Sequence, residues 1–293
     1  EMINKFTLLS NHPNHFGLYH SFQYHCDPHT LIYLTGVIDD SSEEQVLVPT
    51  IVRSLLGYHI IQIACGGQHA AILTNTGEIF SWGRGGFGRL GHGNMEPQAT
   101  PKLIQGLAHK QCKQIACGFA YSAAVDVTGK IYTWGAGENG RLGLGDTADR
   151  FTPVLVTSLQ HIVMDFVAAG SVHTCMKSQR GDIYSCGKFE YTGHGSNVDI
   201  LLPTLLNCFG QTPIKQISVG PGGYHTIALT FDGQVYSWGH NRVGQLGYTM
   251  KLDMPKNNEG AYFLPTPRLV PLPSVADHYT SIGRHDIIES NTN

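Results

Sequence analysis

Short apolar-rich segments, each bounded by Gly, Asn, Thr or Pro, recur along this chain without sustained helical periodicity. In one representative stretch they occupy residues 60–65, 69–74, 78–82 and 101–105. Apolar runs of this length between such boundaries are typical of β-strands. The pattern predicts four strands per unit and almost no helix.

Tight turns are predicted between the second and third segments of each unit. The dipeptides at these junctions are Thr76-Gly77, Thr128-Gly129, Arg180-Gly181 and Asp232-Gly233. Glycine adopts the positive φ that a tight β-hairpin needs at no steric cost. We therefore expect the second and third strands to form a hairpin in every unit.

The units repeat with a constant period. One marker is a Trp-Gly pair or its equivalent, with steps of 52 residues between Trp82-Gly83, Trp134-Gly135, Cys186-Gly187 and Trp238-Gly239. A second series has the same step. Its members each follow a glycine by three residues, and they are His69, Tyr121, His173 and His225. A third steps by 52, 52, 50 and 64 through Pro49, Pro101, Pro153, Pro203 and Pro267, so the last interval contains an insertion.

A four-stranded unit without helix, repeated at this spacing, indicates a β-propeller. In that architecture each small sheet buries its faces against the neighbouring blades. The expected fold class is therefore all-β, with four-stranded antiparallel blades and a repeat of 52 residues.

Three glycine-rich phrases resemble the regulator of chromosome condensation family. They stand at residues 82–93 and 134–145 and at Gly244-Gln245-Leu246-Gly247, and the resemblance covers residues 55–273. WD-type and kelch repeats fit less well, because the first have a shorter period and the second lack the G-[QR]-L-G phrase. The resemblance implies a seven-bladed propeller.

The chain departs from the family pattern at both ends. We interpret residues 1–293 as one propeller domain in which residues 1–54 form a degenerate unit, 55–273 four clear repeats and 274–293 the start of a further partial unit. That is fewer than seven complete blades, so the sequence does not predict how the ring closes.

Composition limits the classes of ligand. Nineteen basic and 22 acidic residues give a net charge of −3, which makes nucleic acid an unlikely direct ligand. No apolar run is long enough to insert in a membrane. Seven cysteines without a CxxC pair, and no secretory signal at the start, favour an intracellular protein, cytoplasmic or nuclear.

Two candidate ligand motifs are better explained by the repeat. Residues 83–88 and 135–140 match G-x-G-x-x-G, but no helix follows to hold a phosphate, and Asn241 breaks the match in the last unit. His69, His173 and His225 fall on separate blades, and Tyr121 takes the same position, so a zinc site is not expected. We predict no cofactor and no metal.

The repeat positions have a structural interpretation instead. We expect each histidine, and Tyr121, to bond a neighbouring backbone group, because buried polar groups need partners. The three tryptophans are expected in the core, and a light-sensing member of the family would need further clustered tryptophans, which this sequence lacks. The structural set comprises Trp82, Gly83, Trp134, Gly135, Gly187, Trp238, Gly239, His69, His173 and His225.

Residues that vary between equivalent loops are candidates for partner recognition, because binding residues concentrate on loops held by a rigid scaffold. They are Arg84, Phe87, Arg89, Glu138, Arg141, Asp149, Arg150, Phe189 and Arg242, with Tyr248, Lys251, Asp253, Lys256 and Tyr262 in the insertion.

No hydrolase or P-loop motif is present, so we predict a non-catalytic propeller that docks a protein partner through loops on one face. Two alternatives remain open. The resemblance permits a guanine-nucleotide exchange factor for a small Ran-like GTPase, with the insertion as a wedge. It also permits the substrate-recruiting domain of a larger ubiquitin ligase or kinase.

Overall fold

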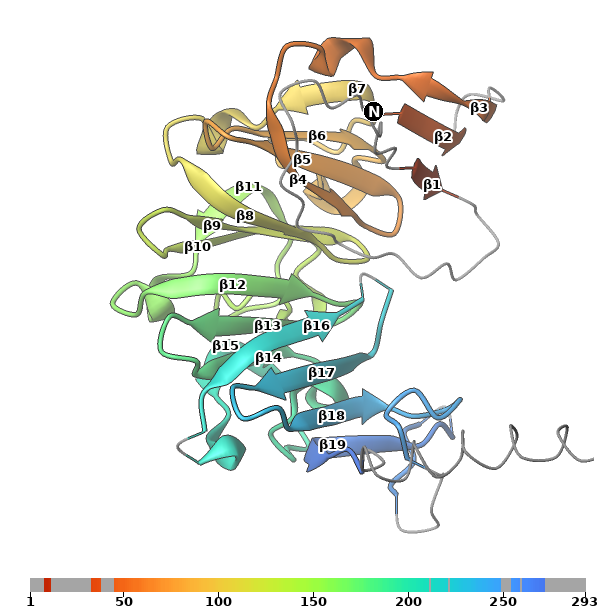
Figure 1. The fold of residues 1–293 in the computed structure, drawn as a ribbon. Coiled ribbons are helices and arrows are strands. Elements are labelled where there is room, and N and C mark those ends of the chain that lie inside the picture. The colour runs from red at the N-terminus through yellow and green to blue at the C-terminus, as the bar shows by residue number, and fades with distance from the viewer. Residues whose placement is uncertain are drawn as a thin grey trace, which may run out of the picture.

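The computed structural model describes residues 8–11, 33–37, 45–210, 212–220, 222–248, 254–258 and 260–271. These residues form five β-sheets that follow one another along the chain (Figure 1). In this described part the α-helical content is the four-residue α1 (Phe189–Thr192). The predicted all-β class is confirmed.

Four of the sheets are four-stranded and antiparallel, and they are the predicted blades. Blade 1 consists of β4 (Ile60–Cys65), β5 (His69–Thr74), β6 (Ile79–Gly83) and β7 (Gln98–Leu103). Blade 2 consists of β8 (Cys112–Cys117), β9 (Tyr121–Asp126), β10 (Ile131–Gly135) and β11 (Arg150–Leu155). Blade 3 consists of β12 (Met164–Ala169), β13 (His173–Ser178), β14 (Ile183–Gly187) and β15 (Ile200–Leu205). Blade 4 consists of β16 (Ile214–Val219), β17 (His225–Thr230), β18 (Val235–His240) and β19 (Phe263–Leu269).

A fifth sheet precedes blade 1. Its strand β1 (Leu8–Asn11) runs parallel to β2 (Tyr33–Val37), which pairs antiparallel with β3 (Gln45–Ile51). The unit predicted as degenerate therefore contributes three strands in the described residues.

The hairpin prediction is confirmed in all four blades. Gly77, Gly129, Gly181 and Gly233 have φ values of 84°, 83°, 91° and 87° in the turns that join the second and third strands. Single 3₁₀ turns occur in the connections between strands, at η1 (Arg53–Leu55), η2 (Gly86–Gly88), η3 (Gln105–Leu107), η4 (Glu138–Gly140), η5 (Thr157–Leu159) and η6 (Asn207–Phe209).

The position of the fourth strand differs from the prediction of residues 101–105. Strand β7 begins at Gln98, because Gln98 pairs with Gly83 across an irregularity that follows Ser81. Pro101 therefore lies inside the strand rather than at its start. Proline is tolerated there because β7 is an edge strand of its sheet.

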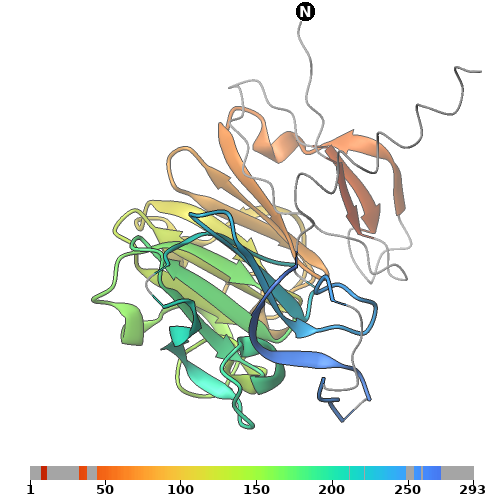
Figure 2. The same cartoon turned by 60° about the horizontal axis from the view of Figure 1, so that its bottom comes forward.

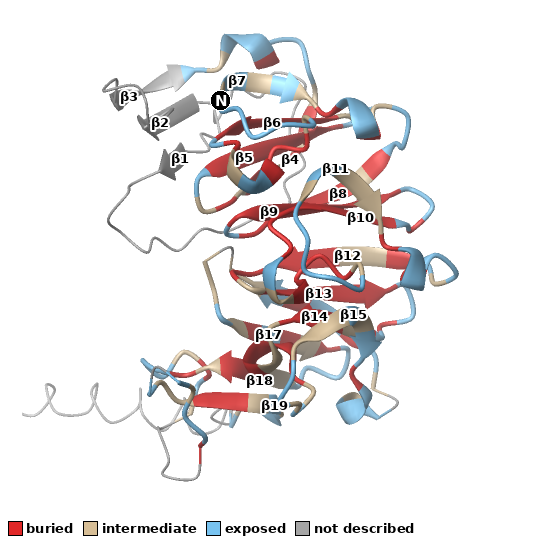
Figure 3. Cartoon of the chain, turned by 180° about the vertical axis from the view of Figure 1, so that it is seen from behind, coloured by how far each residue is buried: buried red, intermediate tan, exposed pale blue. Residues whose placement is uncertain are grey.

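The core lies between blades. One cluster joins Leu73 of blade 1 to Ile115 and Trp134 of blade 2, and another joins Cys175 of blade 3 to Trp238 of blade 4. Figure 3 shows buried residues concentrated on strands of the stacked sheets. Each blade thus buries its apolar residues against the next, as a propeller requires.

Two edges of the stacked blades carry different connections. Because consecutive strands alternate in direction, the first and third connections of each blade emerge at one edge, and the short hairpin emerges at the other (Figure 2). We call the first edge the loop face. Its connections are residues 66–68, 84–97, 118–120, 136–149, 170–172, 188–199, 220–224 and 241–262.

Candidate functional site

The long loops of the loop face leave their blades at the glycine of the Trp-Gly pair. Gly83 has φ 102°, and a β-carbon added there would lie 2.7 Å from the main-chain oxygen of Gln68. The main-chain nitrogen of Arg84 donates to that same oxygen at 2.8 Å. Only glycine therefore lets the long loop start so close to the short loop of its own blade.

Two predicted recognition residues, Arg89 and Arg141, are buried and are corrected here to inter-blade contacts. The Arg141 side chain is only 4% exposed and donates to the main-chain oxygen of Ser171 in blade 3 at 3.2 Å. Arg89 reaches from blade 1 to the main-chain oxygen of Phe119 in blade 2 at 3.4 Å. Loop variation alone does not show which way a side chain turns, and these two turn inward from the 3₁₀ turns η2 and η4.

The main chain of these arginines also ties successive blades together. The main-chain oxygen of Arg89 accepts hydrogen bonds from Trp134 Nε1 and Ser122 Oγ of blade 2, both at 3.0 Å. The oxygen of Arg141 accepts from Thr174 Oγ1 of blade 3 at 2.6 Å. The contact between two successive blades, called a seam below, is thus a hydrogen-bonded junction.

The histidines join the same junctions, but through partners that differ from the expected backbone groups. His69 Nε2 lies 2.8 Å from Ser122 Oγ, and His173 Nε2 lies 2.9 Å from Thr226 Oγ1, each in the following blade. Only the Tyr121 hydroxyl donates to a backbone oxygen, that of His173, at 2.6 Å. For both histidines, the partner is thus a side-chain hydroxyl of the following blade and not the predicted backbone group. This hydroxyl comes within hydrogen-bonding distance of the ring only when the two blades pack.

Burial keeps these histidines neutral. Burial, reinforced by the charge of Arg89, lowers the pKa of His69 to about 3. Burial, reinforced by His225, likewise lowers the pKa of His173 to about 3. Within the described residues no group of three His, Cys, Asp or Glu side chains could hold a metal ion, and the His-rich segment at 12–29 lies outside them.

Burial makes the thiols of Cys65 and Cys175 poor nucleophiles. Burial raises the pKa of Cys65 and of Cys175 to about 12. A thiol with such a pKa is protonated at neutral pH, and the thiolate is the reactive form. These cysteines therefore serve as small packing residues.

The third seam is built differently. In blade 3 the long loop is shorter and forms α1, so Tyr191 replaces the buried arginine and its ring lies 5.3 Å from that of Tyr224 in blade 4. Trp238 Nε1 finds no hydrogen-bond partner in the described part of the chain, whereas Trp134 has one. Phe189, a predicted recognition residue, begins this helix and is partly buried.

Several predicted recognition residues remain at the surface of the loop face. Arg84 is exposed and donates to Gln68 Oε1 at 3.0 Å, and Arg150 pairs with Asp146 at 2.6 Å. Hydrogen bonds from Arg150 lower the pKa of Asp146. The remaining exposed members are Glu138, Asp149 and Arg242.

The tip of the first long loop carries an aromatic side chain on an unusual backbone. Phe87 has φ 62° and is 50% exposed. Blade 2 has Asn139 at the same position with φ 61°, and Asn139 Nδ2 donates to Asp199 at 3.0 Å. Asparagine visits this left-handed region readily, whereas a bulky side chain there is an outlier.

Phe87 belongs to a group of exposed aromatics over the first seam, which we call the aromatic patch: Phe87, Phe119 and Phe151. Phe119 and Phe151 are 47% and 40% exposed. A β-carbon added at Gly88, next to Phe87, would lie 2.4 Å from Phe151 Cδ1. The Arg89 guanidinium lies 5.7 Å from the Phe87 ring centre and also contacts Phe119.

Loop variation predicted Phe87 as a recognition residue but did not predict Phe119 or Phe151. Comparing equivalent loop positions could have found Phe119, which stands where the other units have Gly67, Ser171 and Gly223. That all three residues lie along the seam between blades 1 and 2 is visible only in the folded chain.

The described part of the insertion packs on its own blade. Met254 is buried with Leu246 and Leu264, and Tyr248 and Tyr262 pack against this cluster. The Lys256 ammonium lies 4.7 Å from the Tyr262 ring centre. Lys251 and Asp253 lie outside the described residues.

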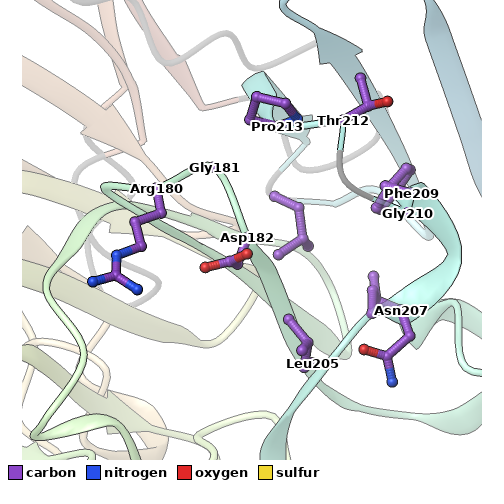
Figure 4. A pocket seen from close by; sticks show the side chains of 11 residues that line it. Arg180, Gly181, Asp182, Leu205, Asn207, Phe209, Gly210, Thr212 and Pro213 are labelled. Atoms are coloured by element: carbon purple, nitrogen blue, oxygen red, sulfur yellow. The ribbon is translucent and has the colours of Figure 1, made fainter.

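A small pocket opens at the opposite edge, between the β13–β14 hairpin and the connection that leads to β16 (Figure 4). Arg180 and Asp182 stand on one side of it and Asn207 on the other. Ser178 donates to Asp182 at 2.9 Å, which is a turn contact. The residues that line the pocket include no paired nucleophile and base, so it supports no catalytic role.

Stacked four-stranded blades with a surface of variable loops at one edge define a repeat propeller of the protein-interaction class. The sequence profile of the RCC1-like domain matches residues 35–288. The chain belongs to this family, as the glycine-rich phrases predicted.

Curated relatives agree with this assignment. The chain is 40% identical over 221 residues to the ultraviolet-B receptor UVR8 of Arabidopsis thaliana, covering 74% of this chain and 50% of that protein. It is 36% identical over 218 residues to the human E3 ubiquitin-protein ligase HERC2, covering 73% of this chain and 4% of the ligase. The chain thus spans half or less of these two relatives.

Solved structures show the same fold. Prp20p from Saccharomyces cerevisiae, whose binding to Gsp1p and histones has been studied, superposes with a TM-score of 0.67 at 27% identity, covering 82% of this chain and 56% of Prp20p. Human WBSCR16 superposes with a TM-score of 0.69 at 23% identity, covering 80% of this chain and 59% of that protein. Among the described residues no helix is long and apolar enough to cross a membrane.

Proposed function

We propose that this chain is a non-catalytic recognition propeller that binds a protein partner through the loop face, with the aromatic patch as its anchor. The observation that carries the proposal is Phe87, a half-exposed aromatic held at φ 62°. Backbone strain of this kind is concentrated at functional sites. An intracellular location, cytoplasmic or nuclear, is part of the proposal.

The chemistry of the patch supports a protein as the ligand. Aromatic residues and arginine dominate the binding energy of protein interfaces, because they bury large areas at low entropic cost. Charged residues of the long loops of blades 1 and 2 and of the start of β11 would form the polar rim that surrounds such an anchor; they are Arg84, Glu138, Asp149 and Arg150.

Binding of a protein partner is tested with a substitution that copies the residue at the equivalent position of another blade. Phe87→Asn installs the residue of blade 2, which adopts the same backbone conformation, so the loop is expected to keep its shape. Proteins captured from the native cell extract by the 293-residue chain would be quantified for the wild type, for Phe87→Asn and for Val243→Asn, the tip residue of blade 4. We expect specific partners to be lost with Phe87→Asn and retained with Val243→Asn.

Equal capture by all three proteins would contradict the proposal. An unchanged melting temperature of Phe87→Asn would show that a loss of binding is not a loss of folding. Phe119→Ala, on the next blade, should reproduce the effect of Phe87→Asn, because both rings belong to the aromatic patch.

A second candidate is a guanine-nucleotide exchange factor for a small Ran-like GTPase, suggested by the 27% identity to Prp20p. Its wedge would be the insertion of residues 248–262. Met254 packs into blade 4, which favours an insertion that covers its own blade over one that projects as a wedge into a GTPase. Release of fluorescent GDP from a Ran-like GTPase is expected to stay unchanged on adding this chain, and accelerated release that is lost on deleting residues 251–253 would establish the exchange factor instead.

The identity to HERC2 suggests a third candidate, the substrate-recruiting domain of a larger ligase. In that case the captured partners would be ubiquitinated in cells that contain the natural protein, and Phe87→Asn would abolish the modification. This role is compatible with the docking proposal, because recruitment is itself recognition by the loop face.

A further inference from the structure

A carboxylate is buried at the third seam, on the loop face. The Glu190 side chain is only 3% exposed, and its atom Oε2 accepts no hydrogen bond within the described residues. The Lys188 ammonium lies 3.1 Å from this oxygen and balances its charge, but the two do not meet hydrogen-bond geometry. A buried acceptor without a hydrogen bond is costly. The carboxylate therefore favours a cation that can also donate to it.

Two tyrosines stand at the same seam. The rings of Tyr191, from the long loop of blade 3, and Tyr224, from the short loop of blade 4, lie 5.3 Å apart. Tyr224 is 38% exposed, so the pair reaches the surface of the loop face. The Lys188 ammonium lies 5.9 Å from the Tyr191 ring centre, within the range of a cation–π contact. Burial, reinforced by the charge of Glu190, raises the pKa of Tyr191, so its ring stays neutral. A carboxylate and an aromatic ring thus already hold one cation here.

The first two seams show which cation this kind of junction accepts. In the second seam the guanidinium of Arg141 donates to the carboxylate of Glu138 at 2.7 Å and to a short-loop oxygen of the next blade at 3.2 Å. In the first seam the guanidinium of Arg89 lies 5.7 Å from the centre of the Phe87 ring. The long loop of blade 3, residues 188–199, contains no arginine. The third seam therefore offers contacts suited to a guanidinium, but its own loop does not supply one.

We propose that the third seam is a binding site for an arginine side chain of the protein partner, with Glu190 as its counter-ion and Tyr191 and Tyr224 as its aromatic wall. This inference rests on the proposed function, because the arginine belongs to the partner that the loop face binds. A guanidinium presents donors in a planar fork that matches a carboxylate, whereas an ammonium is a point charge. Lys188, whose side chain is 33% exposed, fills the site in this structure, and the arginine displaces it.

Other ligand chemistries fit this site less well. An anionic or apolar group that displaced Lys188 would leave the buried carboxylate of Glu190 unpaired, which is strongly destabilising. A lysine of the partner would only exchange one ammonium for another. Arginine alone among the side chains adds hydrogen bonds to the carboxylate while it keeps the charge balanced.

NMR titration of the 293-residue chain, with labelled tyrosine rings, tests the proposal. The probe is N-acetyl-L-arginine methylamide, and N-acetyl-L-citrulline methylamide is its neutral control of nearly the same shape. The arginine probe should shift the ring signals of Tyr191 and Tyr224 saturably, and the citrulline probe should not. Glu190→Gln keeps the shape of the side chain and removes its charge. It should weaken binding of the arginine probe about tenfold, because hydrogen bonds to charged groups are the stronger ones.

Three further variants separate a binding site from a structural ion pair. Lys188→Met should strengthen probe binding, because it removes the competing ammonium and keeps the apolar stem. Tyr224→Leu, at an exposed position that puts folding at little risk, should weaken binding about threefold. Glu96→Gln removes an exposed carboxylate from the same face and should leave binding unchanged. The amide spectrum of each variant verifies its folding.

The absence of a shift with the arginine probe, or equal shifts with both probes, would overturn the proposal. An affinity that neither Glu190→Gln nor Tyr224→Leu lowers would also overturn it, and Lys188 and Glu190 would then form a structural ion pair. The capture experiment judges the proposed function separately. Partners that are lost with Phe87→Asn but retained with Glu190→Gln would refute the arginine site and leave the docking proposal standing.

Discussion

The indole Nε1 of Trp134 in blade 2 donates a hydrogen bond to the main-chain oxygen of Arg89 in blade 1, 3.0 Å away. The same oxygen accepts from Ser122, which in turn contacts His69. One carbonyl of a loop in blade 1 therefore holds two side chains of blade 2. The Trp-Gly repeat is consequently an inter-blade contact as well as an apolar core position.

Trp134→Ala should lower the free energy of unfolding by about 3–5 kcal/mol, because a large buried aromatic and its cavity are involved. Arg242→Ala, at an exposed position of blade 4, should change it by less than about 0.5 kcal/mol. Urea unfolding of both variants measures the difference. Equal small shifts would show that Trp134 does not support the seam.

Arg141→Ala should lower the free energy of unfolding by about 1.5–3 kcal/mol. The substitution removes the buried guanidinium and so leaves the main-chain oxygen of Ser171 without its hydrogen-bond donor. The ion pair with Glu138 contributes little, since the Glu138 side chain is 79% exposed. Glu138→Ala is therefore the matched control and should cost at most about 1 kcal/mol. A larger effect of Glu138→Ala would mean that the ion pair, rather than the seam, dominates.

Acid should destabilise the propeller through its buried histidines. Burial lowers the pKa of His69 in the folded chain to about 3 from its ordinary 6.5, so below pH 6.5 the unfolded state binds a proton that the folded state does not. Stability is thus full above pH 6.5 and falls as the pH drops toward 3. At pH 5 the loss per histidine is up to about 2 kcal/mol.

His69→Tyr tests this linkage, because Tyr121 occupies the equivalent position in blade 2 and does not titrate in this range. Urea unfolding at pH 7.5 and pH 5 should show a smaller difference for His69→Tyr than for the wild type. An identical difference in the two proteins would place the acid sensitivity elsewhere, for example in carboxylates.

Phe87→Asn should raise the free energy of unfolding by about 0.5–1 kcal/mol while it weakens partner binding. Asparagine tolerates the left-handed conformation that Phe87 is forced into, so the substitution relieves strain. Thermal melts of the two proteins measure the change. A clear loss of stability would mean that the Phe87 ring packs as part of the structure and is not held out for a partner.

Much of the fold could be predicted from the sequence because it depends on local and periodic features. The step of 52 residues located the blades, and the glycines at 77, 129, 181 and 233 located the hairpins. Both features express backbone requirements that each unit meets by itself. The fourth strand was misplaced because its start at Gln98 is determined by pairing with Gly83.

The site could be predicted only in part. Loop variation identified Phe87, but it equally identified Arg89 and Arg141, which the fold turns inward. Whether a side chain on a loop is free for a partner depends on the carbonyls that the next blade brings near it. For Arg141 that is Ser171, 30 residues later.

The sequence by itself determined the repeat, the strand count of each blade and the turn positions, because these follow from hydrophobic alternation and from where only glycine fits. Tertiary structure alone decided which varying residues face solvent and which join two blades. It also brought Phe87, Phe119 and Phe151 to one seam. The reason is physical: seam contacts join residues 30 to 60 positions apart, and they exist only once two blades have packed.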